Sequence, residues 1–85
     1  MSQVREIVHN RGLFWVGEND TVADVARRMA ELQVGAILVL EAGALRGIFS
    51  ERDLMRRVVL ERLDLEKTPV KNVMSTQLAT RAITA

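Results

Sequence analysis

The feature that most constrains the fold is a short, continuously apolar run between two polar turns. Residues 36–40 read Ala-Ile-Leu-Val-Leu. Because successive side chains of a strand point to opposite faces of a sheet, an unbroken apolar run predicts a strand that is covered on both faces. Such a strand must be covered by other elements, and the elements predicted around it, in the order strand, helix, strand, strand, helix, indicate a small α/β domain.

The residues before this run have the pattern of an amphipathic helix. Thr21 is a good N-cap, and Asp24 completes the sequence pattern of a capping box. Apolar residues then recur at helical spacing and predict one buried face: Val22, Val25, Ala26, Met29 and Leu32. We expect the helix to end near Gln33. Upstream of it, residues 13–16 predict a short strand that contains two aromatic residues.

The residues after the run predict a hairpin. Gly43 lies in the polar turn 41–44 and is available for a positive φ angle. Residues 45–49 then return as a second strand. Ser50 follows as an N-cap, with Asp53 in the position that completes a second capping box. The start of this helix also offers free backbone N–H groups to an anion. Residues 47–53 therefore support two interpretations, a helix cap and a phosphate or ribose site.

The helix after Ser50 is expected to turn five apolar side chains inward: Leu54, Met55, Val58, Val59 and Leu63. A polar link leads to Pro69, which suits the first turn of a new helical segment. Residues 70–73 (Val-Lys-Asn-Val) then repeat the character of residues 4–7 (Val-Arg-Glu-Ile). Repeated units usually bury a face against each other, so a second unit is expected to begin here.

Composition excludes several classes of function. The net charge of the 85 residues is +1, which gives no electrostatic basis for binding nucleic acid or a membrane surface. The chain has no cysteine and a single histidine, His9, so neither a disulfide nor a zinc site is expected. No catalytic acid–base pair or nucleophile motif is evident, which predicts that the protein is not an enzyme. Without an apolar run of signal or membrane-spanning length, we expect a cytoplasmic protein.

Four segments together resemble a CBS domain, the regulatory module named after cystathionine β-synthase. They are Thr21–Asp24, Val34–Ala36, residues 47–54 (Gly-Ile-Phe-Ser-Glu-Arg-Asp-Leu) and residues 70–75 (Val-Lys-Asn-Val-Met-Ser). The resemblance implies a β-α-β-β-α motif with a small mixed sheet. It divides the chain into an N-terminal helical segment (1–12), one CBS motif (13–66) and the truncated start of a second motif (67–85).

The resemblance also implies a ligand. CBS motifs work in pairs whose clefts hold AMP, ADP, ATP, NAD or S-adenosylmethionine. Carried over by position, Asp53 would bind the ribose hydroxyls, and Ser50 and Arg52 would meet the phosphate. The base would be walled or hydrogen-bonded by Ile48, Val34, Gly35 and Ala36, with Val16 near the opposite side. Arg56 and Arg57 could reach a longer phosphate tail, or they could simply be solvated.

The chain departs from the family pattern because it holds one complete motif and the opening of another. The sheet face that would meet a second motif is then expected to be uncovered, and large exposed apolar patches are uncommon in monomers. We therefore expect a homodimer in which two chains replace the missing pair. The alternative is a structural dimerisation module without a ligand, in which Ser50 and Asp53 serve as caps alone.

Overall fold

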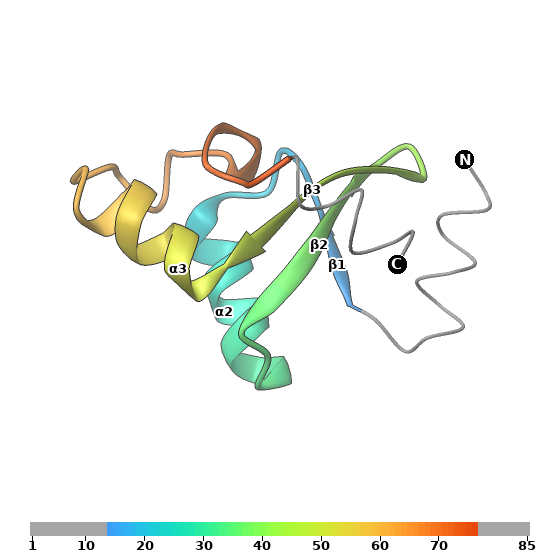
Figure 1. The fold of residues 1–85 in the computed structure, drawn as a ribbon, viewed down its shortest axis with the longest axis horizontal. Coiled ribbons are helices and arrows are strands. Elements are labelled where there is room, and N and C mark those ends of the chain that lie inside the picture. The colour runs from blue at the N-terminus through green and yellow to red at the C-terminus, as the bar shows by residue number, and fades with distance from the viewer. Residues whose placement is uncertain (1–13, 77–85) are drawn as a thin grey trace.

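The computed structural model describes residues 14–76, which form a three-stranded sheet with helices on one face (Figure 1). Strand β2 (Ala36–Glu41) is central, between β1 (Trp15–Gly17) and β3 (Ala44–Ser50). β2 runs parallel to β1 and antiparallel to β3, so the sheet is mixed, as predicted. The helix predicted in residues 1–12 and the repeat beyond residue 76 lie outside the described residues.

Helix α2 (Val22–Leu32) connects the parallel pair β1 and β2. The Thr21 hydroxyl caps it by accepting from the Asp24 amide (3.2 Å), as predicted. The prediction that the Asp24 carboxylate completes the capping box is wrong, because this carboxylate accepts a hydrogen bond from Arg27 instead (2.9 Å). A hydrogen bond with Glu66 further along the chain raises the pKa of Arg27, and it ties α2 to the loop after the last helix.

The core lies between the helices and the sheet. The central strand contributes to it from alternate residues, Ile37 and Val39, which are 2% and 0% exposed. The other buried apolar side chains of this cluster are Val16, Val22, Val25, Met29, Phe49, Val58, Val70 and Val73. On the opposite face of β2, Leu38 and Leu40 are also buried. The run is thus covered on both faces. The prediction of an uncovered sheet face is wrong at Leu38 and Leu40.

The hairpin turn between β2 and β3 places two consecutive residues at positive φ. Ala42 has φ 53° and Gly43 has φ 81°. Positive φ at both central residues is the geometry of the two-residue turn that matches the twist of antiparallel strands. Glycine adopts it without cost, as predicted for Gly43, whereas the alanine side chain makes it unfavourable at Ala42.

Replacing Ala42 with asparagine should therefore stabilise the fold. Asparagine tolerates positive φ, so we expect the free energy of unfolding in urea to rise by about 0.5–1 kcal/mol. The matched control is Ala42→Val, because a β-branched side chain disfavours the same φ and should lower stability. A loss of stability in both variants would contradict the assigned turn geometry.

The last helix differs from the sequence prediction. A short α-helical turn, α3 (Glu51–Asp53), widens into a π-helical segment over Leu54–Val59. Leu54 is half-buried and Val58 fully buried, as predicted, but Met55 and Val59 are 62% and 57% exposed. The inward placement predicted for these two residues is wrong because it assumed the repeat of an α-helix. The segment is π-helical, with hydrogen bonds from residue i to i+5, so the α-helical spacing used in the prediction does not apply here.

The inward placement predicted for Leu63 is wrong as well. The π-helical segment ends at Val59, and the turn that follows it places Arg62 at φ 57°. Leu63 is 40% exposed and lies in a group of exposed apolar side chains on and after the last helix: Met55, Val59, Leu60, Leu63 and Leu65. Among residues 14–76, no helix is long and apolar enough to cross a membrane.

Residues 68–75 fold back onto the motif that precedes them. Val70 lies in a 3-10 turn (Val70–Asn72), and it is fully buried in the core. Its amide donates to the Asp20 carbonyl (2.8 Å), next to the start of α2. Further on, Ser75 and Ile48 exchange two backbone hydrogen bonds of 2.8 Å, so this segment pairs with the outer edge of β3. The opening of the repeat is therefore part of the first motif's packing.

Candidate ligand-binding site

Two sequence segments predicted to form the site meet at one end of the sheet. Ala36, the first residue of β2, pairs with Ser50, the last residue of β3. Just beyond this pair, the Glu51 amide donates to the Gly35 carbonyl (3.0 Å). The hairpin therefore brings residues 34–36 beside the start of α3, although the turn between them is at the other end of both strands.

Ser50 and Asp53 form the predicted capping box. The Ser50 hydroxyl accepts from the Asp53 amide (3.2 Å), and the Asp53 Oδ2 atom accepts from the Ser50 amide (3.0 Å). The Ser50 hydroxyl also lies 3.0 Å from Oδ2 and donates to it. The cap interpretation is confirmed, and it leaves open whether the same residues also bind a ligand.

The second oxygen of Asp53 faces the segment that folds back onto β3. Oδ1 accepts a hydrogen bond from the Ser75 hydroxyl (3.0 Å) and lies 3.6 Å from Arg57 Nε. Arg57 also donates to the Met74 carbonyl (3.1 Å). Asp53 itself is 7% exposed. A buried carboxylate is stable when hydrogen bonds and a cation satisfy it, and here both do so.

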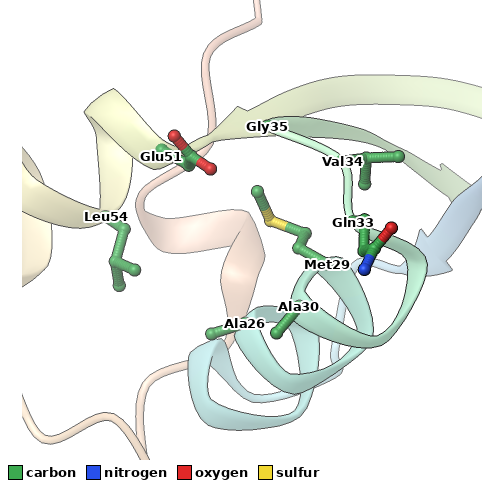
Figure 2. A pocket seen from close by; sticks show the side chains of 8 residues that line it. All are labelled: Ala26, Met29, Ala30, Gln33, Val34, Gly35, Glu51 and Leu54. Atoms are coloured by element: carbon green, nitrogen blue, oxygen red, sulfur yellow. The ribbon is translucent and has the colours of Figure 1, made fainter.

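A pocket of about 410 Å³ opens beside this cap, between α2 and the start of α3 (Figure 2). Two of its lining residues, Val34 and Gly35, were predicted from the sequence to belong to the site. The remaining lining residues are Ala26, Met29, Ala30, Gln33, Glu51 and Leu54. Figure 2 shows the Met29 side chain reaching from α2 toward Glu51 and Gly35. The pocket walls are mostly apolar, and a carboxylate and an amide lie at the rim.

The other predicted residues are distributed around the sheet. Arg52 is exposed on the first turn of the helix. Ile48 packs with Leu38 on the face of the sheet that lies away from the helices. Val16 belongs to the core cluster on the helix-facing side. Ile48 and Val16 therefore lie on opposite faces of the sheet, so a single ligand could contact both only around an edge or end of the sheet.

Sequence reasoning missed Ser75 and Glu51 as neighbours of the site. Ser75 belongs to the predicted repeat, but its contact with Asp53 depends on how residues 68–75 fold back. Glu51 lies between two predicted site residues, and its position on the pocket side follows from the start of α3. A signal for Ser75 was present, because residues 70–75 were part of the family resemblance.

Other candidate chemistry receives no support in the described residues. No group of three or more histidine, cysteine, aspartate or glutamate side chains that could hold a metal ion occurs between residues 14 and 76. His9 lies outside this range. Phe14 and Trp15 are 44% and 42% exposed, which fits an interface better than a core position.

Comparison with known proteins identifies the family. Residues 4–60 match the CBS domain. The chain belongs to the CBS domain family. The match starts upstream of the described residues and ends at Leu60, directly after the π-helical segment, so it includes both the hairpin and the Ser50–Asp53 cap. The observed mixed sheet with two helices is the fold of this family.

Full-length relatives extend beyond this chain. It is 37% identical over 78 residues to the CBS domain-containing protein YhcV of Bacillus subtilis, and the match covers 92% of this chain and 54% of YhcV. The structure of a protein with CBS domains from Burkholderia ambifaria is 32% identical and superposes with a TM-score of 0.76, over 91% of this chain and 58% of that one.

A third similar protein was solved with a ligand. The CBS domain protein of Pyrobaculum aerophilum, complexed with AMP, is 27% identical to this chain. Its structure superposes with a TM-score of 0.68, over 75% of this chain and 50% of that one. The chain thus spans about half the length of each of the three proteins compared.

Proposed function

We propose that this CBS domain is a regulatory module that binds an adenosine-type ligand where residues 34–36 meet residues 50–53. The observation that carries the proposal is the Asp53 carboxylate, which accepts hydrogen bonds from two hydroxyl groups at the end of the sheet. A carboxylate in such a position suits the adjacent hydroxyls of a ribose. The AMP complex of a similar CBS protein supports the same ligand class.

In this proposal, each part of the ligand meets a group of suitable chemistry. The ribose hydroxyls bind Asp53, and the phosphate lies near Ser50 and the exposed guanidinium of Arg52, because a carboxylate would repel it. The base lies against residues 34–36, whose backbone and apolar side chains can recognise shape and edge hydrogen bonds. Ile48 and Val16 would contribute from a paired motif or around the end of the sheet. AMP, ADP, ATP, NAD and S-adenosylmethionine share this chemistry.

The proposed mechanism is regulatory rather than catalytic. Residues 13–66 form one motif, and residues 67–85 begin a second one that would complete a pair. A ligand can shift the equilibrium between two arrangements of paired motifs by its difference in affinity for them, and by no more than that. The module needs no catalytic residue for this.

Self-association is part of the proposal. The supporting observation is the exposed apolar group on and after the last helix, in which Leu60 is 68% exposed and Met55 62%. A chain of this size gains stability when such side chains are buried against a second copy. The proposed contact thus includes the last helix, in addition to any pairing through the sheet.

The test is calorimetric titration with AMP, adenosine, ATP, NAD and S-adenosylmethionine. We expect saturable binding of at least one nucleotide. Arg52→Ala should weaken AMP binding by about tenfold, since a hydrogen bond to a charged group contributes roughly 1.5 kcal/mol or more. Adenosine binding should be unchanged in that variant, because adenosine lacks the phosphate.

The matched control for this titration is Arg28→Ala, which removes an exposed arginine of α2 away from the proposed site. It should leave both affinities unchanged. If none of the five compounds binds while the dimer forms in the same sample, the ligand proposal fails. The structural dimerisation module would then be the better account.

A further inference from the structure

The Asp53 carboxylate accepts three hydrogen bonds from within the chain and faces one cation. An ionised carboxylate offers about four acceptor sites on its two oxygens. Oδ2 accepts from the amide and the hydroxyl of Ser50. Oδ1 accepts from the Ser75 hydroxyl and faces the Arg57 guanidinium at 3.6 Å. Arg57 lies beside the remaining acceptor position, and Asp53 is only 7% exposed, so a ligand hydroxyl reaches the carboxylate only if one of these groups moves away.

Ser75 is the partner that can leave at the lowest cost. Releasing Ser50 would break the helix cap, because the same two residues exchange three hydrogen bonds. Releasing Arg57 would leave a buried carboxylate without its cation. Ser75 contributes one neutral hydroxyl, which water or another hydroxyl can replace. Competition at Oδ1 thus falls on Ser75.

Ser75 also anchors the segment that begins the repeat. Its amide and carbonyl each bond to Ile48 at 2.8 Å, and the neighbouring Met74 carbonyl accepts from Arg57. Residues 74–75 are therefore connected to the Asp53 carboxylate in two ways. The Ser75 hydroxyl donates to it directly, and Arg57 contacts both Asp53 and the Met74 carbonyl. A change at Asp53 is transmitted directly to this segment.

We propose that Oδ1 of Asp53 is shared by Ser75 in the free chain and by a ligand hydroxyl in the bound chain. This inference rests on the proposed function and adds a means of regulation to it. Ligand binding releases the Ser75 side chain and loosens residues 74–75 from the edge of β3, where the second motif begins. Coupling between two binding events is reciprocal. The hydrogen bond between Ser75 and Asp53 must therefore weaken ligand binding by the same factor by which the ligand weakens that hydrogen bond.

The first experiment measures AMP affinity in Ser75→Ala, with Thr76→Ala as the matched control on an adjacent, exposed residue. Removal of the competing hydroxyl should tighten AMP binding about threefold to tenfold, the range expected for one hydrogen bond. Thr76→Ala should leave the affinity unchanged. Equal or weaker AMP binding in Ser75→Ala, with normal binding by the unaltered chain, would overturn the inference.

The second experiment measures amide hydrogen exchange at residues 48 and 75, which needs no ligand. Asp53→Asn replaces an oxygen acceptor and should accelerate exchange at both amides at least about threefold, while amides of α2 keep their rates. Unchanged exchange at residues 48 and 75 would overturn the coupling even if AMP binds. If AMP fails to bind any variant but exchange accelerates, the coupling stands and the proposed ligand class is wrong.

Discussion

Replacing Gly47 with valine should destabilise the protein more than any other single glycine substitution in the described residues. A Cβ atom at this position would lie 2.7 Å from Met74 Sδ and 2.8 Å from the Ser75 carbonyl oxygen. The backbone oxygen cannot move without breaking the pairing between Ser75 and Ile48. Overpacking and the loss of these hydrogen bonds should together lower the free energy of unfolding by about 3 kcal/mol.

The measurement is urea denaturation, with Gly17→Ala as the control. A Cβ atom at Gly17 would meet its nearest neighbours, atoms of the Asp20 side chain, at 3.7 Å, which is ordinary contact. We expect that variant to stay within about 0.5 kcal/mol of the unaltered chain. If Gly47→Val were equally well tolerated, residues 74–75 would not lie against β3 as described.

Replacing Asp53 with alanine should affect both stability and ligand binding. The variant loses the acceptor for the Ser50 amide, the Ser50 hydroxyl and the Ser75 hydroxyl, all within 3.0 Å of the carboxylate. The free energy of unfolding should fall by about 2–3 kcal/mol, the cost of a lost cap and unsatisfied donors. If the carboxylate binds ribose hydroxyls, nucleotide affinity should also fall, by about 30-fold or more.

Asp24→Ala separates these two effects. Asp24 occupies the same position relative to Thr21, but its carboxylate is exposed and pairs with Arg27. Its removal should cost less than about 1 kcal/mol and leave nucleotide affinity unchanged. If Asp53→Ala lost stability yet kept full affinity for the nucleotide, Asp53 would be a cap alone.

The sequence predicted the parts of the fold that depend on local pattern. The apolar run 36–40 became the central buried strand, and the hairpin turn and both N-caps are where the pattern placed them. These features follow from residue period, turn chemistry and capping, each of which is decided within a few neighbouring residues. The hairpin pairs Ala36, at the start of β2, with Ser50, at the end of β3. Because this pairing follows from the hairpin, two segments of the candidate site could be predicted.

The sequence could not predict features that depend on non-local packing. An α-helical repeat predicts Met55 and Val59 on the inner face, whereas both are exposed in the π-helical segment that forms instead. The repeat predicts that Val70 belongs to a second unit, yet its side chain completes the core of the first unit. The contact between Ser75 and Asp53 depends on that folding back. No local pattern contains this information, because the partners are brought together by tertiary contacts.

The most direct test of the ligand proposal is an NMR titration of the ¹⁵N-labelled chain with AMP. The proposal predicts saturable shifts of the backbone amides of Gly35, Ser50 and Asp53, together with residues 74–75. Amides of the hairpin turn at Ala42 and Gly43, at the opposite end of β2 and β3 from these residues, should stay unchanged. The absence of shifts at Gly35, Ser50 and Asp53 at millimolar AMP would contradict a nucleotide site at this end of the sheet.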